Sequence, residues 1–151
     1  MEFNPFVIIP LMLLCGLAAG IPLGMLFGRK TPVEPDAIVK IGASKVSGRG
    51  AFALQSINRG TVIERCPALE VNDRDIGGEL LNYVFYGLEE TTRLVVMGNG
   101  MLFNHSSDPN VAYYREETGL GPELVLYALR DIEKGEELFY SYGDDWWKTR
   151  N

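Results

Sequence analysis

The only histidine of this 151-residue chain lies in a short polar segment, FNHSSDPN, from Phe103 to Asn110. A serine or cysteine hydrolase needs a histidine base beside its nucleophile, and the chain has neither a nucleophile elbow nor a second histidine. A surface turn or an Asn104-His105-Ser106 glycosylation sequon would also fit the residues, although a cytoplasmic domain never meets the glycosylation machinery. We therefore expect His105 to act through its position and main chain rather than as a proton shuttle.

The aromatic segment near the C-terminus, EELFYSYGDDWW, offers a second kind of chemistry. Tyr140 and Tyr142 are separated by one residue, so on a strand their side chains share one face and can direct two hydroxyls into one pocket. Trp146 and Trp147 offer flat surfaces for a cation or an adenine ring. The alternative is that these rings only cover a small core.

A third segment, SGRGAFA, contains Gly48, Arg49 and Gly50 before a strand-like run. Glycine allows the main chain to approach a ligand closely, but a dinucleotide-binding fingerprint would need a third glycine and a following helix. An ordinary turn is the alternative. A zinc site is not expected, because one histidine and two distant cysteines, Cys15 and Cys66, leave too few ligands.

The elements that must position these segments are mainly β. Short runs rich in Val, Ile, Leu, Phe and Tyr are divided by glycines and polar turns, at intervals too small for crossover helices. The stretch from Asp75 to Glu90 differs, because its apolar residues have helical spacing, and it predicts one helix or helical turn. Two similar turns, INRGTVI from Ile57 and IEKGEEL from Ile132, each precede a strand.

The N-terminus predicts a separate membrane element. Residues 5–28 carry no charge, and as a helix they would reach ~36 Å, enough to cross a membrane. A cleaved signal peptide would begin with basic residues, whereas here Arg29 and Lys30 follow the apolar run. The positive-inside rule then predicts a single-pass anchor with the following domain on the cytoplasmic side. Residues 29–36 form a basic flank and proline-rich linker, and the domain is expected over 37–151.

Two further patterns concern partners. Glycines at 16, 20, 24 and 28 of the apolar run permit close helix packing and a homodimer, although Pro22 interrupts the ridge, so self-association stays an open alternative. The net charge of −6 disfavours direct nucleic-acid binding and is compatible with a basic peptide substrate.

In this order, GRGAFA, NHSSDPN and ELFYSYGDDWW resemble the motifs of the SET-domain protein-lysine N-methyltransferases, over roughly Ile38 to Trp147. The Ser-Tyr-Gly-Asp-Asp ending looks most similar to the compact viral members. The resemblance implies a β-clip-like fold of small curled sheets with one short helical insert. It also implies a C-terminal pseudoknot, in which the last strand passes a loop beside Asn104 and His105.

The resemblance implies S-adenosylmethionine as the cofactor. Gly48, Arg49 and Gly50 would hold its methionine end, and Asn104 and His105 would contact it, the histidine largely through its backbone at the adenine. By the same resemblance, the Trp147 ring would lie against the adenine.

The resemblance also implies transfer of a methyl group to a lysine of a protein or peptide substrate. Tyr142 matches the catalytic tyrosine, and Tyr83 matches a residue that contacts both cofactor and substrate. Tyr140 occupies the Phe/Tyr switch, which implies mainly monomethylation.

The channel for the substrate lysine needs a closing wall. The cysteine-rich zinc cluster that closes it in many members has no counterpart after Trp147, so Trp146 and Trp147, or a neighbouring subunit, are expected to close the channel. The alternative function is a membrane-tethered SET-like module that binds a peptide or cofactor without catalysis.

Overall fold

The computed structural model describes residues 36–148. The predicted membrane helix over 5–28, its glycine ridge and nearly all of the linker lie outside these residues. Within 36–148, no helix is long and apolar enough to cross a membrane.

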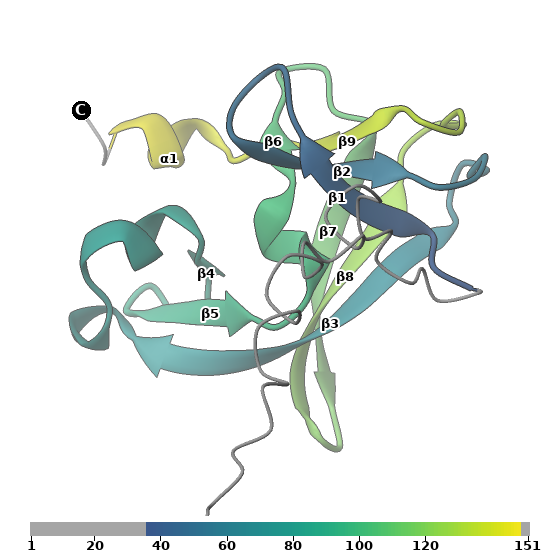
Figure 1. Cartoon of the computed structure of the whole chain (residues 1–151). Helices are drawn as coiled ribbons and strands as arrows, with labels where there is room; N and C mark the ends of the chain where they lie inside the picture. Colours follow the sequence, from purple (N-terminus) through teal and green to yellow (C-terminus); the bar gives the residue numbers. More distant parts are fainter. Residues whose placement is uncertain (1–35, 149–151) are drawn as a thin grey trace, which may run out of the picture. The chain divides into compact units, whose positions relative to one another are not determined.

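The smaller sheet has four strands in the order β1-β2-β9-β6 (Figure 1). These are β1 (Val39–Ala43), β2 (Arg49–Ala53), β9 (Glu137–Tyr140) and β6 (Asn104–His105). The last strand of the chain thus lies between two strands that precede it, antiparallel to β2 and parallel to β6. The predicted placement of the C-terminal strand beside the Asn-His segment is confirmed.

The larger sheet has five strands in the order β4-β5-β3-β8-β7 and is antiparallel throughout. Its strands are β3 (Val62–Asn72), β4 (Phe85–Tyr86), β5 (Thr92–Val96), β7 (Val111–Thr118) and β8 (Gly121–Ala128). The β7–β8 hairpin projects from the domain as a long arm, and β3 curves across both halves of the sheet (Figure 1). The predicted mainly β fold of curled sheets is confirmed.

Short helical elements connect these strands. Over residues 36–148 the 3₁₀ turns are η2 (Asp73–Asp75), η3 (Gly78–Asn82) and η4 (Asn99–Leu102). One α-helix, α1 (Asp144–Lys148), follows β9 directly. It brings the tryptophan pair back over the β-sheets.

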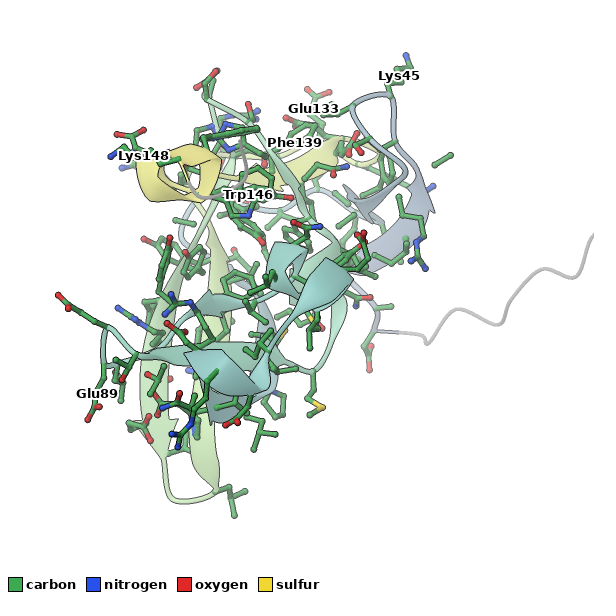
Figure 2. The ribbon with its side chains drawn as sticks, turned by 90° about the vertical axis from the view of Figure 1, so that its left-hand side faces the viewer. Lys45, Glu89, Glu133, Phe139, Trp146 and Lys148 are labelled. Carbon is green, nitrogen blue, oxygen red and sulfur yellow. The ribbon has the colours of Figure 1, made fainter. Side chains whose placement is uncertain are left out.

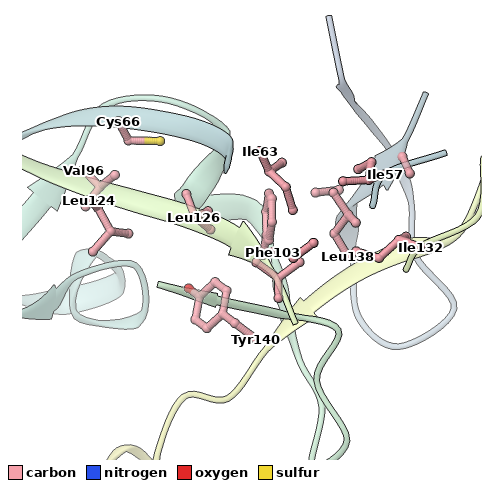
Figure 3. Close-up of a cluster of buried hydrophobic side chains, with 14 of the residues drawn as sticks. Ile57, Ile63, Cys66, Val96, Phe103, Leu124, Leu126, Ile132, Leu138 and Tyr140 are labelled. Atoms are coloured by element: carbon pink, nitrogen blue, oxygen red, sulfur yellow. The ribbon is translucent and has the colours of Figure 1, made fainter. Parts of the chain in front are cut away.

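The hydrophobic core lies where the two sheets face each other. Leu124 and Leu126 of β8 share one face of the strand and belong to this core, and Val125 between them is fully buried as well. Leu138 and Tyr140 of β9 meet them from the smaller sheet, and Phe103, between η4 and β6, joins the same core (Figure 3). Tyr140 is thus part of the core, and Tyr142, two residues later, packs against it.

The two similar turns pair with each other. Ile57 and Ile132 exchange two main-chain hydrogen bonds, of 2.9 and 2.8 Å, and both side chains are buried. Gly60 and Gly135, at equivalent places in the turns, have φ values of 82° and 89°, a region that favours glycine. These turns anchor the starts of β3 and β9.

The prediction of a helix over Asp75–Glu90 is correct only in its first part. A 3₁₀ turn forms over Gly78–Asn82, and the chain then becomes strand β4. Phe85 of β4 pairs with Leu94 of β5 and packs on the rings of Tyr113 and Tyr140, a burial that a continuing helix could not provide. The leucines of the predicted apolar face stay largely exposed.

Candidate active site

Asn104 holds the glycine-containing loop against the C-terminal strand. Its Nδ2 donates to the carbonyl oxygens of Ser47 and Arg49, at 3.2 and 3.1 Å, and to Oε1 of Glu137 at 3.0 Å. Because three acceptors orient the amide, its Oδ1 faces away from them, and no residue within 36–148 donates to that oxygen. Asn104 therefore presents a fixed acceptor to a ligand.

Gly50 leaves room for this arrangement. A Cβ at Gly50 would overlap the Glu137 carboxylate that accepts from Asn104. Gly48 has a φ of 47°, and a Cβ there would meet nothing within 4 Å, so it faces open space. A glycine is thus favoured at position 48 by the backbone conformation and at position 50 by the close approach of Glu137.

Tyr142 lies next to the Asn-His strand and is held at both ends. Its main-chain N–H donates to Nδ1 of His105 at 3.1 Å, and its hydroxyl donates to the carbonyl oxygen of Phe103 at 3.0 Å. The His105 ring also contacts the edge of Trp147, with ring centroids 5.2 Å apart. The ring of His105 thus contacts two residues of the C-terminal segment, while the predicted role of its main chain stays a prediction.

A cavity at this place, here called the glycine-loop cavity, has a volume of about 260 Å³. Five of the predicted site residues line it: Gly48, Arg49, Tyr83, Asn104 and Tyr142. The rest of its wall consists of Ser47, Asn82, Met101, Leu102, Phe103 and Trp146.

The other predicted cofactor residues do not line this cavity. Gly50 faces Glu137, the His105 ring lies between Tyr142 and Trp147, and Trp147 itself is 48% exposed. The tryptophan that lines the cavity is its neighbour Trp146. The cofactor roles of Gly50, His105 and Trp147 stay predictions.

A second and much smaller space, the tyrosine cavity, has a volume of about 20 Å³. It is lined by Tyr83, Tyr113, Tyr140, Tyr142 and Trp146, together with residues of β4. The rings of Tyr140 and Tyr142 are 5.2 Å apart, so the structure brings the two tyrosines to one space as their spacing predicted. Tyr83, Tyr142 and Trp146 line both cavities, which therefore adjoin at these rings.

Burial favours the neutral form of two phenols of the tyrosine cavity, Tyr140 and Tyr142. Burial raises the pKa of Tyr140 well above 10, and the nearby hydroxyls of Tyr142 and Tyr113 raise it further. Burial also raises the pKa of Tyr142, with a smaller contribution from Tyr83. Tyr142 can therefore donate and orient, but a phenolate base is disfavoured.

The sequence pointed to Trp146 and Trp147 as a pair, and the structure shows where the Trp146 ring lies. Its ring centroid lies 4.9 Å from that of Tyr142. Figure 2 shows it on the side of α1 that faces the sheets, whereas Lys148 points outward. Trp146 lines both cavities and Trp147 lines neither, but the predicted closing function of the tryptophan pair stays a prediction.

Sequence reasoning missed Tyr113, Phe85 and Glu137. Tyr113 and Phe85 reach the site from β7 and β4, far apart in the chain, and no local motif marks them. Glu137 lies in the quoted C-terminal motif, so the motif could have indicated it.

Two adjoining cavities, one beside an oriented amide and a glycine loop and one lined by phenols, can hold two ligands that meet at Tyr142. Together with the curled sheets and the inserted last strand, this site defines a SET-domain protein. The family model for the SET domain matches residues 48–143, and the chain belongs to this family.

Among curated proteins, the chain is similar to the Schizosaccharomyces pombe histone-lysine N-methyltransferase specific for H3 lysine-37. The two are 34% identical over 113 residues, covering 72% of this chain and 76% of that protein. It is also 31% identical over 117 residues to the Danio rerio N-lysine methyltransferase KMT5A-A, covering 64% of this chain but only 33% of that protein. The chain thus spans most of the first relative and about a third of the second.

Among solved structures, the chain is similar to a Plasmodium falciparum protein described as a histone methyltransferase. The TM-score is 0.64 at 32% identity, covering 72% of this chain and 96% of that one. The fold is also similar to that of ctPRC2 bound to S-adenosylmethionine, with a TM-score of 0.62 at 24% identity, covering 75% of this chain and 16% of that one.

Proposed function

We propose that the chain is an S-adenosylmethionine-dependent protein-lysine N-methyltransferase. The observation that carries the proposal is the junction of the glycine-loop cavity and the tyrosine cavity at Tyr142. A donor in the first and a lysine side chain in the second would meet at this ring. Family membership and the named activities of the relatives support the same reaction.

The residues of the glycine-loop cavity fit this cofactor. Asn104 Oδ1 is oriented to accept from an ammonium group, and the main chain at Gly48 is open to a ligand. The hydroxyl, amide and aromatic groups around the cavity match a polar ligand with an apolar ring. When bound, S-adenosylmethionine supplies a methyl group on a positively charged sulfur.

The tyrosine cavity suits a lysine that must lose its proton. A free lysine of pKa ~10.4 pays roughly 4 to 5 kcal/mol to be neutral at pH 7. Aromatic walls disfavour the charged ammonium through desolvation, which lowers this cost. Tyr142, held by Phe103 and His105, orients the amine without acting as a base.

Mainly monomethylation is part of the proposal. About 20 Å³ of free space admits the amine end of a lysine side chain, which is about as large as a water molecule, and little else. The side chain of Tyr140 borders this space and is 7% exposed. A hydroxyl with a water molecule would leave little space for an already methylated nitrogen.

We further propose that residues 5–28 anchor the enzyme in a membrane with the SET domain on the cytoplasmic side. The support is the uncharged run followed by Arg29 and Lys30. Self-association through the glycine ridge belongs to the same proposal as an alternative that can be tested by crosslinking in membranes.

The test uses the full chain in detergent. Calorimetry with S-adenosylmethionine measures binding, and labelled cofactor with a mixed lysine-peptide array measures transfer. We expect both for the natural chain, and for Tyr142→Phe we expect binding but a loss of transfer of about 10²- to 10³-fold. Tyr127→Phe, on the outer side of β8, is the matched control and should transfer normally.

The outcomes separate the alternatives. Cofactor binding without labelling of any peptide or of the chain itself would favour the non-catalytic module. An absence of cofactor binding by a folded chain would overturn the proposed function.

A further inference from the structure

A third cavity, the outer groove, opens beside the tyrosine cavity. It has a volume of about 230 Å³, and its walls include Leu81 and Asn82 of η3, Tyr86 of β4, Arg93 of β5 and Trp146 of α1. Asn82, Tyr86 and Trp146 line the tyrosine cavity as well. A peptide whose lysine enters the tyrosine cavity would therefore place a neighbouring residue at this groove.

Arg93 is the only charged residue among the described ones that line the groove. Its Nη1 contacts Oδ1 of Asp73 at 3.0 Å and donates to the carbonyl oxygens of Glu90 and Thr92 at 3.0 and 2.6 Å. The guanidinium also lies over the Tyr86 ring, 4.7 Å from its centroid. These contacts fix the group in one orientation.

Part of the Arg93 guanidinium has no hydrogen-bond partner among the described residues. All three contacts involve Nη1, and within 36–148 neither Nε nor Nη2 has an acceptor. The side chain of Arg93 is 21% exposed, so these N–H groups are only partly hydrated. A fixed, partly buried guanidinium fork with free N–H groups matches the two oxygens of a carboxylate.

We propose that the outer groove binds an acidic side chain close to the target lysine of the protein substrate, with Arg93 as the specificity-determining residue. The inference rests on the proposed methyltransferase function and names its substrate class. Leu81, Tyr86 and Trp146 contact the apolar stem, and Nε and Nη2 of Arg93 donate to the carboxylate. An arginine at the same substrate position would face Arg93 and is disfavoured.

This preference for an acidic residue at the groove differs from the effect of the net charge of the chain. The net charge of −6 attracts basic substrates over long distances, whereas the groove selects one residue at contact. A preferred substrate is therefore basic overall, with a Glu or Asp beside the modified lysine.

The experiment uses the full chain in detergent, labelled S-adenosylmethionine and peptides with one central lysine. Glu, Gln or Arg is placed at each flanking position in turn, and kcat/KM is measured. At one position we expect Glu to be preferred over Arg by about tenfold or more. Arg93→Gln should bring this ratio close to one, and Arg93→Glu should invert it.

Arg74→Gln is the matched control, because it removes the same charge from an exposed position in η2. It should keep the Glu preference. The ratio compares two peptides on one enzyme preparation, so partial loss of folded protein does not change it.

A Glu preference that Arg93→Gln leaves unchanged, or labelling with no preference at any position, would overturn this inference alone. Failure to label any peptide would overturn it together with the proposed function.

Discussion

The main-chain N–H of Tyr142 donates to Nδ1 of His105 over 3.1 Å. Nδ1 is thus the acceptor of this hydrogen bond. Tyr142 lies two residues after the end of β9, and His105 of β6 already pairs with Tyr140 of β9 in the parallel ladder. The single histidine of the chain therefore positions the proposed catalytic tyrosine.

His105→Ala should reduce methyl transfer by about tenfold, because Tyr142 loses one of its two holding contacts. His105→Asn should restore most of the activity, since its side-chain oxygen can accept from the same N–H. Steady-state kinetics with a labelled peptide measure both. Equal losses in the two variants would contradict the positioning role.

Gly50→Ala should weaken cofactor binding more than it lowers stability. The new Cβ displaces the Glu137 carboxylate and so releases Asn104, but a carboxylate end can move without unfolding the chain. Gly48→Ala should instead lower stability by about 1 kcal/mol, because its φ of 47° disfavours a side chain. Calorimetry and urea unfolding separate the two effects, and the same profile for both variants would contradict the distinction.

Tyr140→Phe should shift the products toward dimethyl- and trimethyl-lysine. Removing its hydroxyl enlarges a space of about 20 Å³, which leaves room for a methylated nitrogen. Mass spectrometry of the peptide products gives the distribution. Tyr114→Phe, 44% exposed on the outer side of β7, should leave it unchanged. Unchanged products from Tyr140→Phe would remove the switch assignment.

Stability should fall at alkaline pH because of the buried phenols. Burial raises the pKa of Tyr140 above 10 in the folded chain, so the fold favours the neutral phenol. Its contribution is complete below pH ~10 and is lost as the pH rises from there toward the folded-state pKa. Urea unfolding at increasing pH should show a shallower decline for Tyr140→Phe than for the natural chain. Parallel curves would show that Tyr140 does not contribute.

Local sequence patterns predicted the turns well, because a single glycine favours the backbone conformation that such a turn needs. Glycines at 60 and 135 marked turns that do adopt positive φ. The run from Asp75 to Glu90 had helical spacing, but Phe85 is more deeply buried in a strand against Tyr113 than a helix would allow. The competing contact is distant in sequence, so no local pattern could reveal it.

For the candidate site too, local motifs predicted some residues and could not predict others. Motifs identified Gly48, Arg49, Asn104 and Tyr142, which the structure brings to one cavity. They could not distinguish Trp146 from Trp147, because which ring of the pair faces inward depends on how α1 meets the sheets.

By itself, the sequence determined the strand-rich class, the order of the three motifs and the uncharged N-terminal run. These follow from residue type and spacing, which act over a few residues. Only the tertiary structure decided that the last strand lies between β2 and β6, that His105 holds Tyr142, and that Arg93 faces a groove beside the tyrosines. Such contacts join residues far apart in the chain, and they depend on how two sheets bury one core.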